Sequence, residues 1–203
     1  MYRTFTTVVI FLCIWLLPDY ASSTKIKSSW KNPSATASSL QFKKVLVMAT
    51  IRHSFTRKIA EDKAVHIIEA GGRAHAVPSY TIIGDEELGD QELVKSKIEG
   101  MGFDGVIFMH YAGAKDQRKY AAQDNSSWGL WYPGWGAVYN ATTTNDTTVF
   151  IETMFYSLKE DKLIWSGISE TKNPKNPAKV VGEIAEETMK ILQKEGLIAT
   201  TKK

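Results

Sequence analysis

Four histidines are the residues of this chain that most readily suggest metal binding or acid–base chemistry: His53, His66, His75 and His110. His66 and Glu69 stand three positions apart in a segment with helical spacing, so their side chains share one face. A zinc protease instead needs two histidines four residues apart with a glutamate between them. No cysteine or carboxylate stands at a characteristic ligand spacing from any of the four. The sequence therefore predicts neither a metal site nor a cofactor.

Motifs for covalent catalysis and for phosphate binding are also missing from the sequence. There is no Gly-x-Ser-x-Gly, and Ser166 and Gly167 fall in an expected hairpin strand rather than on a strand-to-helix elbow. Gly71 and Gly72 precede an expected strand, so they lack the helix N-terminus that would bind a phosphate. We predict no catalytic residues and no enzymatic activity. The alternative is a hydrolase or metal-dependent enzyme that uses His110, His53 or His75 near strand ends.

The most unusual segment is rich in tryptophan, tyrosine and glycine and runs from Trp128 to Tyr139 (WGLWYPGWGAVY). Aromatic side chains bury large areas and keep a polar group available, which suits a binding surface. The candidate partner-binding residues are Trp128, Trp131, Tyr132, Trp135 and Tyr139. The alternative is that these side chains fold back over the sheet as a lid or form an ordinary strand pair.

The composition is that of an ordinary globular protein. The chain has 203 residues, of which 43% are hydrophobic and 23% are charged, so disorder and coiled coil are not expected. The formal net charge of +3 gives no reason to expect a nucleic-acid partner. A single cysteine, Cys13, excludes a disulfide framework.

Residues 1–23 read as a signal peptide, in which Arg3 precedes the apolar run Val8 to Leu17. This run is about half the ~20 residues that a membrane-spanning helix needs. Cleavage after Ser23 would remove Cys13 and leave no stable membrane span, and it would place the protein in the periplasm or outside the cell. The alternative is a retained N-terminal anchor.

The rest of the chain is expected to form one domain behind a tether. Residues 24–41 are rich in Ser, Thr and Lys, and we predict a flexible arm there, followed by a domain at 42–199 and a tail at 200–203. Apolar and alternating runs predict strands at 43–51, 73–83, 105–111, 147–157 and 163–171. Helical spacing between cap and stop signals predicts helices after Ser54, after Asp90 and from Pro177. The order β-α-β-α-β-β-β-α predicts a single α/β domain with a mixed sheet, parallel in its first half and ending in an antiparallel hairpin.

Several segments make the chain resemble small envelope lipoproteins of bacteria. They are SSTKIKSSWKNP after the leader, the KKVLVMA strand, Val77 to Tyr80, Gly102 to Val106, Lys162 to Ser166, and Gly196 to Ile198. The order of elements also resembles the α/β domain shared by the N-terminal part of TolB, CsgG and LpoB-type activators. In such lipoproteins a lipidated cysteine stands where this chain has Tyr20, so a lipid anchor is not expected.

Together these features predict an exported, non-enzymatic envelope protein that binds an envelope protein or a cell-wall component. The resemblance to CsgG also allows an oligomer, and a self-assembling structural component is a further alternative.

Overall fold

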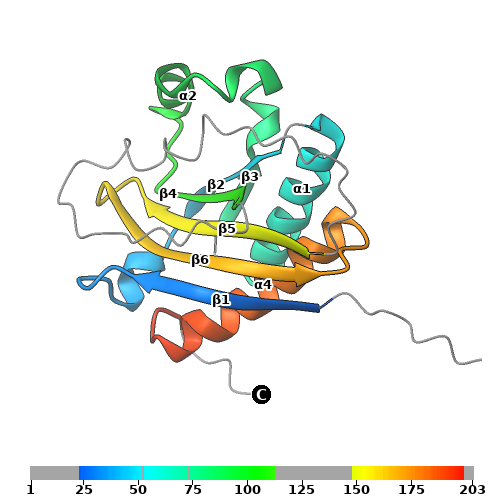
Figure 1. Ribbon diagram of the computed structural model, residues 1–203. Helices are drawn as coiled ribbons and strands as arrows, with labels where there is room; N and C mark the ends of the chain where they lie inside the picture. The colour runs from blue at the N-terminus through cyan, green and yellow to red at the C-terminus, as the bar shows by residue number, and fades with distance from the viewer. Residues whose placement is uncertain (1–22, 52, 73, 113–147, 199–203) are drawn as a thin grey trace, which may run out of the picture.

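The computed structural model describes residues 23–51, 53–72, 74–112 and 148–198. These residues form a six-stranded sheet in the order β1-β6-β5-β4-β2-β3 (Figure 1). The strands are β1 (Ser23–Lys31), β2 (Lys44–Thr50), β3 (His75–Pro78), β4 (Gly105–Tyr111), β5 (Thr148–Ser157) and β6 (Lys162–Lys172). Strand β2 runs parallel to β3 and β4, whereas β4, β5, β6 and β1 pair antiparallel. The predicted single α/β domain with a mixed sheet is confirmed.

Two of the described helices begin directly after a residue whose side chain caps them. Helix α2 (Gln91–Ile98) begins after Asp90, whose side chain accepts a hydrogen bond from the Leu93 amide. Helix α4 (Pro177–Lys194) begins after Asn176, which accepts from the Lys179 amide. Helix α1 spans Ser54–Ala70, and short 3-10 turns occur at η1 (Ala37–Leu40), η2 (Ser79–Thr81) and η3 (Asp85–Glu87).

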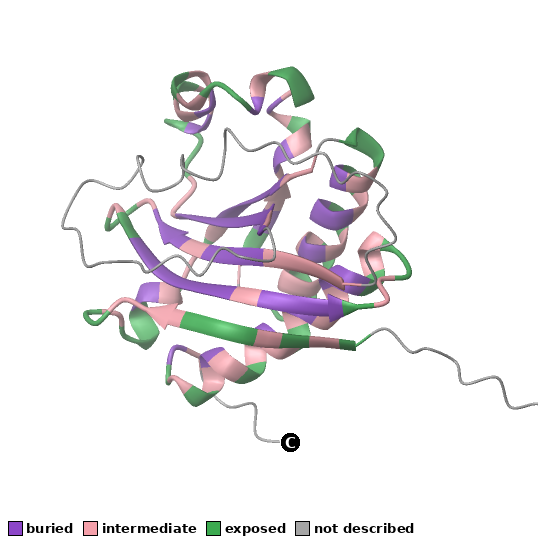
Figure 2. Ribbon diagram, viewed as in Figure 1, coloured by how far each residue is buried: buried purple, intermediate pink, exposed green. Residues whose placement is uncertain are grey.

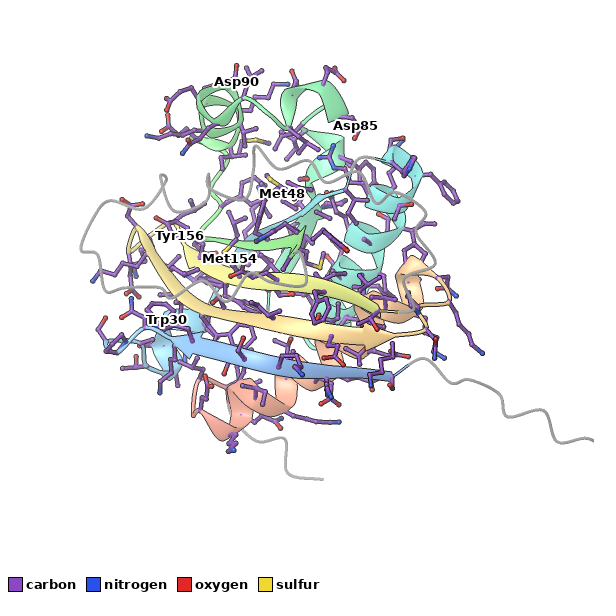
Figure 3. All side chains as sticks on the ribbon, viewed as in Figure 1. Trp30, Met48, Asp85, Asp90, Met154 and Tyr156 are labelled. Carbon is purple, nitrogen blue, oxygen red and sulfur yellow. The ribbon has the colours of Figure 1, made fainter. Side chains whose placement is uncertain are left out.

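The sheet separates two apolar layers because side chains alternate along each strand. On one face Val106 and Phe108 of β4 join Met48, Met154 and Tyr156 beneath α2. Figure 3 shows Met48 and Met154 toward the middle of the sheet and Tyr156 near the end of β5, while Asp90 lies beside α2 and Asp85 lies on the side of α1.

The opposite face packs on α1 and α4. Ile107 and Met109 of β4 meet Ala60 and Ala64 of α1 and Val181 of α4 there. A smaller cluster buries Trp165 of β6 against Leu192 and Leu197. Gly167 lies against the Trp165 indole, where any Cβ would collide with the ring, so this glycine serves packing in a strand.

The flexible arm predicted for residues 24–41 is wrong, because Ser23–Lys31 forms edge strand β1 on β6. This strand is largely exposed (Figure 2), and polar contacts rather than apolar burial hold it. The Thr24 hydroxyl donates to Glu183 Oε2 of α4 at 2.6 Å, and Lys27 Nζ lies 3.0 Å from Glu170 Oε2 of β6. Trp30 adds a partly buried aromatic contact with the core. The composition of residues 24–41 predicted disorder because composition counts the apolar residues of a segment and does not show which strand the segment pairs with.

The second predicted strand, residues 73–83, is also wrong in its length. Within the described residues, β3 covers only His75–Pro78, and the chain then turns into η2. Pro78 has no amide hydrogen to continue a ladder. The amide of Tyr80 instead donates to the Glu61 carboxylate at 2.9 Å, which fixes the turn to α1.

Candidate functional site

The carboxyl ends of the parallel strands form the edge at which α/β sheets usually bind ligands. Strands β2, β3 and β4 end there at Thr50, Pro78 and Tyr111. Thr50 pairs with His110 across β2 and β4, and His110 pairs with Glu152 across β4 and β5. Near this edge lie two pairs of buried polar side chains, Arg57 with Glu61 and His110 with Glu152.

The first polar group at this edge is a buried ion pair one helical turn apart on α1. Arg57 and Glu61 both have fully buried side chains, and Arg57 Nε lies 2.9 Å from Glu61 Oε1. The guanidinium also donates to Ser79 Oγ and to Asp85 Oδ1, each at 2.8 Å. Every charged nitrogen of Arg57 thus has an oxygen partner, which compensates for the removal of the cation from water.

Glu61 accepts hydrogen bonds from three further groups. The Ala49 amide, beyond the last β2–β3 pair, donates to Oε1 at 2.9 Å, and Ser79 Oγ donates to the same oxygen at 2.8 Å. The Tyr80 amide donates to Oε2. The carboxylate therefore joins α1, β2 and η2. We interpret this network as structural, because its donors and acceptors are engaged with each other.

Next to this network, a hydrogen bond with Asp62 changes the pKa of Tyr80. Tyr80 donates its hydroxyl to Asp62 Oδ1 at 2.7 Å. This hydrogen bond to a carboxylate raises the pKa of Tyr80 above its usual value, and partial burial adds to the effect. A phenol with a raised pKa remains protonated at neutral pH and is a poor nucleophile.

The second polar group at this edge pairs His110 with Glu152. His110 Nε2 and Glu152 Oε2 are 3.0 Å apart without the alignment of a hydrogen bond, and the side chains are 4% and 2% exposed. Among the described residues, His110 Nδ1 and Glu152 Oε1 have no hydrogen-bond partner. The Phe108 ring lies 5.6 Å from the imidazole. Imidazole and carboxylate are the groups most used in general acid–base catalysis, so this pair is the candidate acid–base group.

The other histidines do not join this pair. His75 begins β3 opposite Lys44, at the other end of the parallel strands, and its Nδ1 lies 3.0 Å from Glu69 Oε1 at the surface. His53 precedes α1 as its N-cap, and His66 is exposed on that helix. No three potential metal ligands come together in the part of the chain that the structure describes.

The five aromatic residues predicted to bind a partner lie outside the described residues, as do residues 1–22. Their attachment is nevertheless defined on both sides. Strands β4 and β5 are antiparallel neighbours, and the Ala112 amide donates to the Phe150 carbonyl at 2.9 Å just before the connection. The connection that contains Trp128 to Tyr139 therefore leaves the sheet and returns to it at the same edge.

The network around Arg57 and Glu61 was not predicted from the sequence. Its signal was an arginine and a glutamate four residues apart in a helix, interleaved with Ala60 and Ala64. Such a pair is usually a solvated surface contact. In the folded chain the pair is fully buried, because β2 and the η2 turn cover it.

Among the described helices, none has both the length and the apolar character to cross a membrane.

No protein-family model and no curated protein matches the sequence. The fold is distantly similar to solved structures of PelC dodecamers from Paraburkholderia phytofirmans. One comparison gives 12% identity and a TM-score of 0.41 over 88% of this chain and 98% of PelC. A single-substitution variant of PelC gives 13% identity and a TM-score of 0.40 over 82% and 95% of the two chains.

Proposed function

We propose that this chain is an exported, non-enzymatic protein of the bacterial cell envelope that binds another envelope component through residues 128–139. The periplasm or the cell exterior is the expected compartment, because residues 1–23 have the features of a signal peptide. The partner would be an envelope protein or a cell-wall component.

The observation that carries this proposal is the place of the aromatic segment in the chain, between β4 and β5. Tyr111 of β4 and Ile151 of β5 face each other, and two residues suffice to join such antiparallel strands. Joining β4 to β5 therefore does not require the segment that contains Trp128, Trp131 and Trp135. Long connections on a rigid scaffold commonly carry function in compact domains.

The polar groups of the scaffold support a non-enzymatic function. Arg57, Glu61 and Ser79 satisfy one another's hydrogen bonds. The Ser79 hydroxyl donates to a carboxylate that already accepts from Arg57 and two amides, so it is not poised as a nucleophile.

The proposal is tested with two tryptophan substitutions made together, Trp131→Ala and Trp135→Ala. The protein is produced in cells with its own leader, cross-linked to the envelope, and recovered with its partners for mass spectrometry. We expect the double variant to lose the partner and to keep a thermal transition close to that of the unchanged protein. Phe55→Ala is the matched control, because Phe55 is an aromatic side chain 75% exposed on α1.

Two results would contradict the proposal. Partner capture retained by the double variant, together with a large loss of thermal stability, would support the lid instead. An intact leader on protein recovered from the cytosol would overturn the exported location. Light scattering of the purified protein separates binding to a different partner from assembly of identical copies.

The pair His110–Glu152 favours a second candidate, a hydrolase with its cleft at the carboxyl edge. The test is hydrolysis of ester and peptide substrates together with metal analysis. Turnover that disappears in His110→Gln, or stoichiometric zinc in the purified protein, would replace the binding proposal.

A further inference from the structure

We propose that the space between α1, α4 and the sheet binds a small neutral aliphatic molecule that carries one hydroxyl or carbonyl oxygen. A cavity of about 180 Å³ lies there, on the sheet face opposite α2. Helix α1 contributes Ala64 and Ile68, the sheet contributes Ile107 and Phe155, and α4 contributes Val181 and Met189. Figure 1 shows α1 and α4 on this one side of the sheet.

Two buried hydroxyl groups mark this cavity as more than a packing defect. Thr153 of β5 and Thr188 of α4 both line it, and they are 5% and 3% exposed. Within the part of the chain that the structure describes, neither Oγ1 atom has a hydrogen-bond partner. A helical threonine commonly donates to the carbonyl four residues earlier, and Thr188 does not use that partner. Buried hydroxyls are normally satisfied. Both oxygen atoms are hidden in the free protein, so rotation about the Cα–Cβ bond of each threonine would present its hydroxyl to a bound molecule.

The rest of the lining limits the charge of the ligand. The described residues around the cavity include no Lys, Arg, His, Asp or Glu. An ionised carboxylate or amine would lose its hydration there without gaining a counter-charge. A hydroxyl or carbonyl oxygen costs less to transfer and can bond to a threonine hydroxyl, which both donates and accepts.

The volume limits the size of the ligand. An apolar cavity of about 150 Å³ holds a benzene molecule, so this one accepts roughly six to nine non-hydrogen atoms. Ile67, Ile68 and Met189 on its boundary are only partly buried, which gives a small molecule a route to the interior. Water alone is a weaker occupant, because a buried water makes about three hydrogen bonds and this lining is almost entirely apolar.

The experiment uses 1-hexanol as the probe, and hexanoate at pH 8 as a probe of similar size that differs in charge. Binding is followed by NMR of the isoleucine and methionine methyl groups of the full domain. We expect 1-hexanol to shift the methyl signals of Ile184 and Met189 saturably, whereas hexanoate leaves them unchanged. Equal binding of both probes, or no saturable shift with either, would overturn the proposal.

Two substitutions test the hydroxyls without changing the volume. Thr153→Val and Thr188→Val should each raise the melting temperature of the free protein, because an unpaired buried hydroxyl is removed. The double variant should bind 1-hexanol about fivefold more weakly, the loss expected for one hydrogen bond.

A buried threonine outside the cavity provides the matched control. Thr171 is fully buried on β6, and its hydroxyl lies 2.8 Å from that of Thr24, so Thr171→Val should lower stability and leave hexanol binding unchanged. Unweakened hexanol binding by the Thr153/Thr188 double variant would show that the hydroxyls take no part and would overturn the proposed ligand class.

Discussion

At the scale of single residues, the buried charges of Arg57 and Glu61 on α1 connect β2, η2 and η3 through hydrogen bonds. Glu61 binds the end of β2 through the Ala49 amide and the η2 turn through the Tyr80 amide. Arg57 extends the same contacts to Asp85 in η3. One carboxylate thus replaces the backbone partners that are lost where β3 stops after four residues.

We predict that Glu61→Ala lowers the free energy of unfolding by about 3–5 kcal/mol, because it leaves the Arg57 guanidinium buried without its main partner. Chemical denaturation measures this loss. The double variant Glu61→Leu with Arg57→Met should lose less than the sum of the two single changes, since neither charge is then left unpaired. Additive losses would show that the two side chains are not coupled.

The sequence does not show that Arg57 and Glu61 form a buried network, although their spacing can be read from it. An arginine and a glutamate four positions apart describe an exposed pair equally well. The pairing of His110 with Glu152 was equally hidden, because it depends on the register between β4 and β5. The sequence singled out His110 as one of four histidines, but the carboxylate beside it comes from a distant strand.

At the scale of elements, local signals located most strands and helices and failed at both edges of the sheet. Strands β2 and β4 are buried on both faces and therefore read as continuous apolar runs. Edge strand β1 contains few apolar residues, and its order depends on β6 and α4. Edge strand β3 ends early at Pro78, although Thr81 to Ile83 continue in apolar and β-branched residues. Pairing with β6 orders β1, whereas Pro78 and the contact of the Tyr80 amide with Glu61 end β3.

We predict that acid loosens β1 before the centre of the sheet. The ammonium group of Lys27, hydrogen-bonded to Glu170, lowers the pKa of that carboxyl below its ordinary value of 4.5, and Lys25 adds to this. A lowered pKa in the folded state means that the contact stabilises the fold fully above pH 4.5 and is lost as pH falls through the folded pKa. Protection factors from hydrogen exchange should therefore decrease in β1 between about pH 5 and pH 3.

The substitution Glu170→Gln is the control for this effect, because it removes the titrating group. Its β1 protection should already be low at pH 7 and should change little with acid. Glu87 also has a lowered pKa, owing to Lys97, and its effect should appear near α2 instead. An equal loss over the whole sheet in the unchanged protein would contradict a local role for Glu170.

At the scale of the whole molecule, the two ends of the described chain close the same side of the domain. Glu195, after α4, accepts hydrogen bonds from Ser29 of β1 and from the Trp165 indole at 2.9 and 3.0 Å. Lys31 donates to its carbonyl at 3.1 Å. Leu197 packs beside Trp165 and is 1% exposed. The order of β1 therefore depends on residues more than 160 positions away.

We predict that Leu197→Ala lowers the free energy of unfolding by about 2–5 kcal/mol, because it opens a cavity beside Trp165. Adding Glu195→Ala should also remove the hydrogen-exchange protection of β1, although no residue of β1 is changed. Met101→Ala is the control, since that side chain is 40% exposed and should leave both measurements unaltered. If β1 keeps its protection in the double variant, the pairing of β1 with β6 suffices by itself. If that protection is lost, the N-terminal strand is held in place by the residues that follow α4.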